Sequence, residues 1–237
     1  MGKYLFFFFL SNGLRFGDFI ELYSECSTAC LLIDLISELL IPSELNGAEA
    51  NLLYFNTDGN LNLGDLSQIL RQKLSNRLQS ITGTCSKYNL NNLDTLLDSA
   101  LKNIYILNIY EPTQFYTSIQ NMENILMKNP NISLLVFDTI TSFYWCEQNF
   151  KVTKMDTYLK NILYLIKKTV KDYKVIVLYT RPKYFSSSKE SIENLDPCSK
   201  DSSEEQINYR IQISTNVCKQ NELITYGTYI LLLLGIV

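Results

Sequence analysis

Histidine is absent from this chain of 237 residues, and its six cysteines are scattered without a C-x-x-C pair. Without histidine, the chain cannot build a Ser-His or Cys-His nucleophile pair or use the commonest general base. Structural zinc sites need several closely spaced cysteine or histidine ligands, so this spacing argues against one. An even cysteine count is compatible with disulfides, but a chain of this length can form its own core. We therefore expect reduced, intracellular cysteines.

An excess of basic residues is also missing, since the net charge is −3. A protein that binds duplex DNA through its own surface usually shows a basic excess. Any contact with nucleic acid should therefore be local, or shared with a partner. The apolar fraction of 46% is ordinary for a globular core. The length suits one domain, so we expect residues 1–237 to form a single domain with an apolar N-terminal segment at residues 1–16.

Long apolar runs are missing too, because the runs at residues 4–10 and 229–237 are far shorter than a membrane helix. A membrane-spanning helix needs roughly 20 apolar residues. We expect both runs to be buried strands and the protein to have no membrane span. The alternative for the N-terminal run is a weak targeting signal, with secretion as the minor case.

Short apolar strands alternate with amphipathic helices along most of the chain. Strands are expected at residues 18–23, 52–55, 104–109, 132–138 and 175–179, and helices at 27–40, 66–78, 93–101, 113–128 and 155–170. This alternation predicts an α/β fold with a mainly parallel sheet covered by helices on both faces. Residues 207–213 and 222–237 should add an antiparallel C-terminal edge. Residues 183–206, rich in serine and acidic side chains, are predicted to form a flexible loop.

Ligands of an open parallel sheet bind beyond the carboxyl ends of its strands. The first strand runs into residues 24–30, S-E-C-S-T-A-C, and then directly into a helix. A phosphate-binding loop of the form G-x-x-x-x-G-K-[ST] belongs at such a place. Here glycine and lysine are missing, and Glu25 puts a negative charge where an anion would sit. Ser27 and Thr28 are expected to cap the helix, and contact with magnesium is the alternative.

Two carboxylates stand at other strand ends. Asp138 closes an apolar strand, as a Walker-B carboxylate that holds magnesium through water would do. Asp58 follows the strand at residues 52–55 and could face Asp138, although Asp58-Gly59 also suits a simple turn. The sequence thus places Ser27, Thr28 and Asp138 in a vestigial nucleotide site.

Three stretches add specificity through their order and spacing: G-D-F-I-E-L at residues 17–22, L-Y-F-N-T-D at 53–58, and L-L-V-F-D at 134–138 running on to F-Y-W at 143–145. Together they resemble the RecA-like recombinases of eukaryotes, and in particular the small paralogue that lacks the usual N-terminal helical domain. The resemblance covers about two thirds of the chain.

The resemblance implies a RecA-like P-loop ATPase core that assembles with sister paralogues in the nucleus. Such complexes promote homologous recombination at DNA double-strand breaks, so this chain would meet DNA through the complex. By the same resemblance, Asp138 would bind magnesium and Asp58 stands where active members place the general-base glutamate. Pro182 stands where the family has a glutamine that senses the γ-phosphate.

The departures from the family pattern favour one of three possible functions. A P-loop enzyme without its lysine loses the main electrostatic clamp on the transferring phosphate. We therefore expect an adaptor subunit with a degenerate ATP site, for which ATP and magnesium are only possible cofactors. The alternatives are a DNA-stimulated ATPase with a divergent phosphate loop and a P-loop-derived scaffold unrelated to DNA.

An adaptor acts by contact, and two apolar features are candidates for its interface. The segment at residues 5–10, which contains Phe7 and Phe9, could add a strand to a neighbour's sheet, or could pack on this protein's own core. Trp145, in the aromatic cluster at residues 143–145, is expected in the core or at a partner interface rather than on a base-stacking platform.

Overall fold

The computed structural model describes residues 14–24, 27–82, 93–148, 154–182, 207–215 and 229–235. Its centre is one sheet with the strand order β3-β2-β4-β5-β1-β6-β7. The strands are β1 (Phe19–Ser24), β2 (Asn51–Asn56), β3 (Ile104–Asn108), β4 (Ile132–Asp138), β5 (Ile176–Pro182), β6 (Tyr209–Thr215) and β7 (Tyr229–Gly235). Each neighbouring pair from β3 to β6 is parallel, whereas β7 pairs antiparallel with β6.

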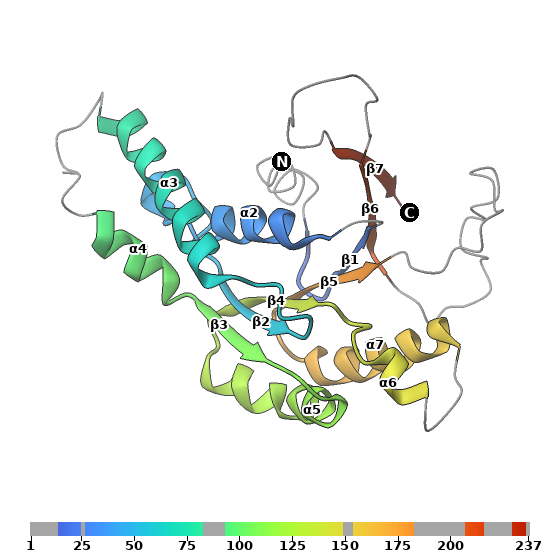
Figure 1. Cartoon of the computed structure of the whole chain (residues 1–237). Coiled ribbons are helices and arrows are strands. Elements are labelled where there is room, and N and C mark those ends of the chain that lie inside the picture. The colour runs from blue at the N-terminus through green and yellow to red at the C-terminus, as the bar shows by residue number, and fades with distance from the viewer. Residues whose placement is uncertain are drawn as a thin grey trace, which may run out of the picture.

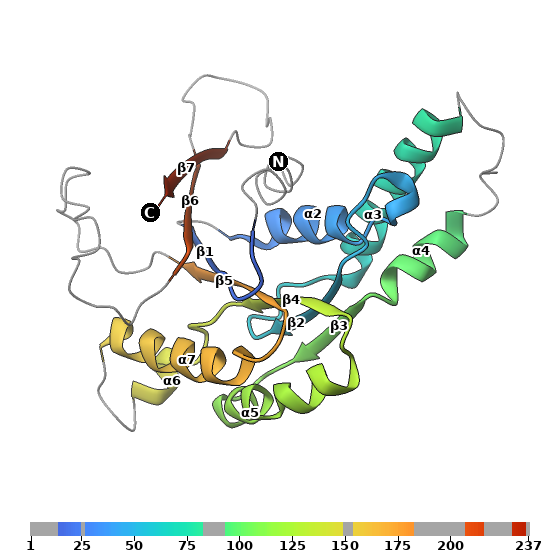
Figure 2. The same ribbon diagram turned by 180° about the vertical axis from the view of Figure 1, so that it is seen from behind.

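Helices cover both faces of the sheet, which confirms the predicted α/β class (Figure 1). One face is covered by α2 (Ala29–Leu39), α3 (Leu63–Thr82) and α4 (Leu93–Leu101), and the other by α5 (Pro112–Lys128), α6 (Tyr144–Gln148) and α7 (Met155–Val170). The view from behind shows the same two layers (Figure 2). A short 3₁₀ helix, η1 (Ser43–Leu45), follows α2.

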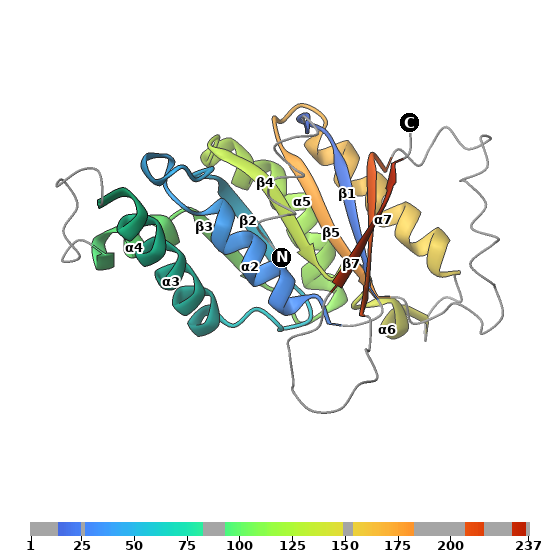
Figure 3. The same cartoon turned by 90° about the horizontal axis from the view of Figure 1, so that it is seen from above.

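The alternation of side chains along β1 explains why two cores form. Ile20 and Leu22 pack into the core with α2 and α3, and Phe19 packs into the core with α5 and α7. Successive side chains of a strand point to opposite faces, so an apolar strand supplies both layers. Seen from above, α2 and α3 lie on one side of the strands and α7 lies on the other (Figure 3).

Strand β5 is longer than the sequence indicates, since it continues beyond residue 179 to Pro182. The added residues are paired in register with β1, where Thr180 lies opposite Leu22 and Pro182 opposite Ser24. Polar Thr180 and Arg181 ended the apolar pattern, but backbone pairing with a long neighbouring strand extends β5 past it. The structure also forms η1 and α6, which the periodicity did not predict.

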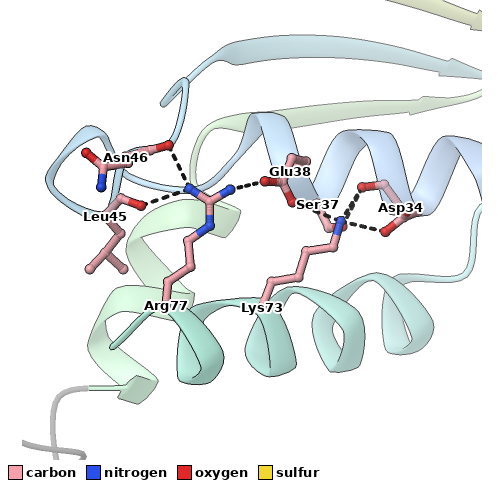
Figure 4. A network of polar contacts seen from close by, with 7 residues as sticks. All are labelled: Asp34, Ser37, Glu38, Leu45, Asn46, Lys73 and Arg77. Atoms are coloured by element: carbon pink, nitrogen blue, oxygen red, sulfur yellow. Dashed lines mark hydrogen bonds and ion pairs between the residues drawn. The ribbon is translucent and has the colours of Figure 1, made fainter. Parts of the chain in front are cut away.

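Four side chains join α2 to α3 through ion pairs (Figure 4). The Lys73 ammonium lies 2.6 Å from an Asp34 carboxylate oxygen and 3.2 Å from one of Glu38. Arg77 pairs with the other Glu38 oxygen. The Glu38 side chain is only 5% exposed, so these cations compensate a carboxylate that has lost most of its water.

Some sequence predictions fall outside the described residues, namely Phe7 and Phe9 of the N-terminal segment and the predicted flexible loop at residues 183–206. The arrangement of residues 1–237 as one domain stays a prediction. Within the part of the chain that the structure describes, no helix is both long enough and apolar enough to span a membrane.

Candidate functional site

The carboxyl ends of β1, β2, β4 and β5 meet at one edge of the sheet because these strands are parallel and in register. Asn56 lies opposite Asp138, and Ser24 lies opposite Pro182. A cavity of about 100 Å³ opens at this edge. Four residues that the sequence proposed for a nucleotide site line it: Ser27, Thr28, Asp58 and Asp138. Its other lining residues are Ser24, Asn60, Thr139, Thr180, Arg181 and Pro182.

Asp138 is buried at the floor of the site, with 2% of its surface exposed. Tyr54 donates its hydroxyl hydrogen to Asp138 Oδ2 over 2.6 Å, and Thr180 donates to Asp138 Oδ1 over 2.7 Å. Both carboxylate oxygens are thus held by hydroxyl groups of neighbouring strands. This arrangement fixes the orientation of the carboxylate and replaces part of its lost hydration.

The environment of Asp138 changes its acidity. Burial raises the pKa of the Asp138 carboxyl, the hydroxyls of Tyr54 and Thr180 oppose this, and the charge of Asp58 adds to the rise. The net effect is a raised pKa of the Asp138 carboxyl. Burial, together with the charge of Asp138, raises the pKa of Tyr54 far above its ordinary value, so this hydroxyl remains a donor.

Asp58 lies on the loop after β2 and is exposed. Ser142 Oγ lies 2.7 Å from Asp58 Oδ1 and 2.7 Å from Thr57 Oγ1. Thr57 Oγ1 also lies 2.7 Å from the Thr139 carbonyl oxygen. Each hydroxyl has one hydrogen. The consistent assignment has Ser142 donating to Asp58 and Thr57 donating to either Thr139 or Ser142. The loop after β4 therefore fixes the Asp58 carboxylate.

The connection from β1 to α2 is short, since β1 ends at Ser24 and α2 begins at Ala29. Ser27 accepts a hydrogen bond of 3.4 Å from the backbone N–H of Ala29, the first residue of the helix. Thr28 occupies the N-cap position, but its side chain makes no capping hydrogen bond. The prediction that both residues cap the helix is therefore wrong for the Thr28 side chain, and Ser27 lies one residue before the N-cap.

Arg181 is the one basic residue among the described residues that line this cavity. Its guanidinium lies 2.9 Å from an Asp156 carboxylate oxygen and 3.7 Å from the buried Glu21 carboxylate. Two acidic side chains outside the cavity therefore compensate its charge. The cavity itself contains two further carboxylates, Asp58 and Asp138.

Trp145 lies apart from this cavity, on α6, and 56% of it is exposed. Its neighbour Tyr144 is buried against Tyr158 of α7, with ring centroids 5.4 Å apart. Glu147 accepts a hydrogen bond of 3.1 Å from the Tyr116 hydroxyl of α5. The short helix α6 is thus anchored to α5 and α7, while Trp145 faces outward.

Three residues of the site were not found from the sequence: Tyr54, Thr180 and Ser142. Tyr54 lies within an apolar strand, where tyrosine is an ordinary core residue. Thr180 stands one position beyond the apolar run of β5, and polar residues at strand ends were the signal that identified Asp58 and Asp138. The same signal, applied to β5, would have found Thr180.

No protein-family model matches the sequence. The chain is 20% identical over 182 residues to DNA repair protein XRCC2 of Mus musculus, an alignment that covers 75% of this chain and 60% of that protein. It is 27% identical over 178 residues to DNA repair and recombination protein RadB of Methanosphaera stadtmanae, covering 74% of this chain and 63% of that protein. The chain is a distant homologue of RecA-like recombinase paralogues.

This homology confirms the family resemblance that the sequence indicated and makes the fold RecA-like by homology. The chain spans 60% and 63% of the lengths of these two relatives. The sheet-end cavity, defined by the lining residues given above, lies where a RecA-like fold of parallel strands places its ligand, beyond the strands' carboxyl ends.

Proposed function

We propose that this protein is a non-catalytic adaptor subunit of a recombinase-paralogue complex that acts in homologous-recombination repair of DNA double-strand breaks. The observation behind the proposal is the charge of the sheet-end cavity. Two carboxylates, Asp58 and Asp138, line it, and its Arg181 is paired with Asp156 and Glu21. With its one described basic side chain already paired, the cavity offers the phosphates of a nucleotide no free positive charge.

The phosphate-binding elements of an active ATPase are also missing. The loop between β1 and α2 contains neither glycine nor lysine, whereas P-loop enzymes cradle the phosphates with glycine-rich backbone and a lysine. A cavity of about 100 Å³ is small beside the roughly 300 Å³ at which pockets for drug-sized ligands begin. These residues do not fit ATP, and the cavity is best interpreted as a vestigial nucleotide site.

The magnesium role of Asp138 is weakened by its hydrogen bonds. Magnesium is held by carboxylates, waters and substrate phosphates in octahedral geometry. Both oxygens of Asp138 already accept hydroxyl hydrogens from Tyr54 and Thr180, and its raised pKa favours the neutral acid more than an exposed carboxyl would. We infer that Asp138 now stabilises the fold.

Asp58 stands where active members of the family place the general base, but its surroundings argue against that role. Its carboxylate is fixed by Ser142 rather than held open for a water molecule, and it is one methylene shorter than glutamate. A general base must come within hydrogen-bond reach of the proton that it removes. With no clamp for the γ-phosphate, Asp58 has no positioned water to activate.

The place of the protein in repair rests on its relatives. Their names describe a DNA repair protein and a DNA repair and recombination protein. We infer that this chain works in the nucleus with sister paralogues and meets DNA through that complex. Its net charge of −3 supports an indirect contact with DNA. Trp145, exposed on the anchored helix α6, is our candidate anchor for the paralogue, because buried tryptophans dominate many protein interfaces.

Complementation of cells that lack this protein tests the proposal. Loss of the protein should sensitise cells to double-strand breaks, and both the wild type and Asp138→Asn should restore survival, because no magnesium role is needed. Failure of Asp138→Asn at normal protein levels would favour the DNA-stimulated ATPase. An absence of any repair defect would favour a scaffold unrelated to DNA.

Co-purification tests the partner. The tagged wild-type protein should capture another RecA-like protein, and Trp145→Ala should reduce that capture about tenfold or more, as loss of an interface anchor does. Tyr164→Ala is the matched control, since Tyr164 is an aromatic residue of α7 that is 67% exposed. Equal capture by both variants would remove Trp145 from the interface.

A further inference from the structure

Three polar side chains form a row across the strands β5, β1 and β6. Tyr179 of β5 lies opposite Glu21 of β1, and Glu21 lies opposite Arg210 of β6. Neighbouring strands are about 4.8 Å apart, so side chains in register on one face of a sheet lie side by side. Tyr179 belongs to the core that the sheet forms with α5 and α7. Both Tyr179 and Glu21 are 0% exposed, so neither side chain contacts bulk solvent.

Two polar atoms of this row have no hydrogen bond. Among the residues that the structure describes, neither the Tyr179 hydroxyl nor Glu21 Oε1 has a hydrogen-bond partner. The other carboxylate oxygen, Glu21 Oε2, accepts a hydrogen bond from Arg210. Buried polar groups of native proteins are nearly always paired, either with protein atoms or with ordered water. Two unpaired atoms on neighbouring strands therefore call for a shared partner.

Arg181 brings a further polar group to the same place. Its Nη1 lies 3.7 Å from Glu21 Oε1, which is too long for a hydrogen bond, and its Nη2 lies 2.9 Å from an Asp156 carboxylate oxygen. A polar contact beyond about 3.5 Å is a common place for a bridging water. The carboxylate oxygen thus has a positive charge near it but no donor in contact.

The Tyr179 hydroxyl is a donor in this setting. Burial raises its pKa well above the ordinary value, the charge of Glu21 adds to the rise, and the charges of Arg210 and Arg181 oppose it. The hydroxyl therefore keeps its hydrogen at neutral pH. A hydroxyl that must donate and a carboxylate oxygen that can only accept are complementary to a water molecule, which does both.

We propose that one buried water molecule is bound between the Tyr179 hydroxyl and Glu21 Oε1, with Arg181 Nη1 as its third polar neighbour. The water oxygen accepts the hydroxyl hydrogen of Tyr179, and one water hydrogen is donated to Glu21 Oε1. Buried waters typically make about three hydrogen bonds to groups that lack other partners. The proposal is independent of the adaptor function, since it invokes neither the sheet-end cavity nor a protein partner.

Tyr179→Phe tests the water through the sign of its effect on stability, measured by urea denaturation of the full chain. If the water is bound, the substitution removes its donor and should lower the folding equilibrium constant about fivefold or more. If no water is bound, the substitution removes an unpaired hydroxyl from the core, and the constant should stay the same or rise. Tyr110→Phe is the matched control. Tyr110 is 75% exposed, so that variant should change the constant by less than about twofold.

A crystal structure of the wild-type chain at high resolution examines the water itself. The expected result is electron density for one water molecule within hydrogen-bond distance of both the Tyr179 hydroxyl and Glu21 Oε1. The proposal is overturned if that place holds no water, or if Tyr179→Phe is as stable as the wild type or more stable.

Discussion

Tyr54 of β2 donates a 2.6 Å hydrogen bond to Asp138 of β4, its neighbouring strand in the sheet. In an active P-loop site, a carboxylate at this place serves a metal ion. Here it is bound from within the protein by Tyr54 and Thr180. If the nucleotide site is vestigial, these two hydrogen bonds should support the fold rather than catalysis.

Tyr54→Phe should lower the free energy of unfolding by about 1–3 kcal/mol, because it leaves a buried carboxylate oxygen without its donor while keeping the ring in the core. Urea denaturation measures the change. Tyr110→Phe is the control, since Tyr110 is 75% exposed and should change stability by less than about 0.5 kcal/mol. Equal stability of the two variants would show that the Tyr54 contact does not stabilise the fold.

The raised pKa of Asp138 should also make the free energy of unfolding depend on pH. Burial raises the folded-state pKa of this carboxyl above 3.8, its ordinary value. Between the pKa of the unfolded chain and the higher pKa of the folded protein, the folded protein keeps a proton that the unfolded chain has released. The free energy of unfolding therefore falls as pH rises through this window. Asp138→Asn lacks this titration.

The measurement is urea denaturation of the wild type and Asp138→Asn from about pH 4 to neutral pH. The free energy of unfolding of the wild type, relative to that of Asp138→Asn, should decrease with rising pH over the lower part of this range. Asp172→Asn, at an exposed position, serves as the control. A difference that grows with pH would mean that the pKa of Asp138 is lowered, as expected for a carboxylate that is held ready for a cation.

The ion pairs between α2 and α3 predict unequal effects for two arginines of the same helix. Arg77 pairs with buried Glu38 and also donates to the carbonyl oxygens of Leu45 and Asn46 over 2.8 and 2.6 Å. Arg77→Met should cost about 2–4 kcal/mol, because Lys73 alone then compensates Glu38. Arg71→Met should cost less than about 1 kcal/mol, since its partner Asp94 is 73% exposed.

Thermal or urea unfolding of these two variants gives the comparison directly. Both substitutions keep a long apolar stem on α3, so the difference between them reports the ion pairs and hydrogen bonds. A larger loss for Arg71→Met than for Arg77→Met would contradict the ranking of buried over exposed pairs.

The sequence predicted much of the candidate site because a parallel sheet brings all its carboxyl strand ends to one edge. Asp58 and Asp138 each follow an apolar strand, and that pattern alone placed them together with Ser27 and Thr28. The hydrogen bonds of Asp138 could not be predicted from the sequence, because Tyr54 and Thr180 are 84 and 42 residues away along the chain. Which core tyrosine meets the carboxylate depends on strand order and register.

Two elements of the fold differ from the sequence prediction because contacts distant in the chain determine them. Hydrophobic periodicity ended β5 before Thr180, whereas pairing with β1 continues the strand to Pro182. The helix α6 is too short to show a period, and its position is set by contacts of Tyr144 and Glu147 with α5 and α7. Contacts between residues distant in the sequence determine the end of β5 and the position of α6, so a local sequence pattern does not predict them.

If the sheet-end cavity is a vestigial nucleotide site, it no longer binds ATP. Isothermal titration calorimetry of the full chain with magnesium and ATP tests it most directly. No saturable heat is expected, because the loop between β1 and α2 has neither glycine nor lysine and the Arg181 of the cavity is already paired. A dissociation constant in the low micromolar range, roughly −8 kcal/mol of binding free energy, would require a working phosphate site and would contradict the account.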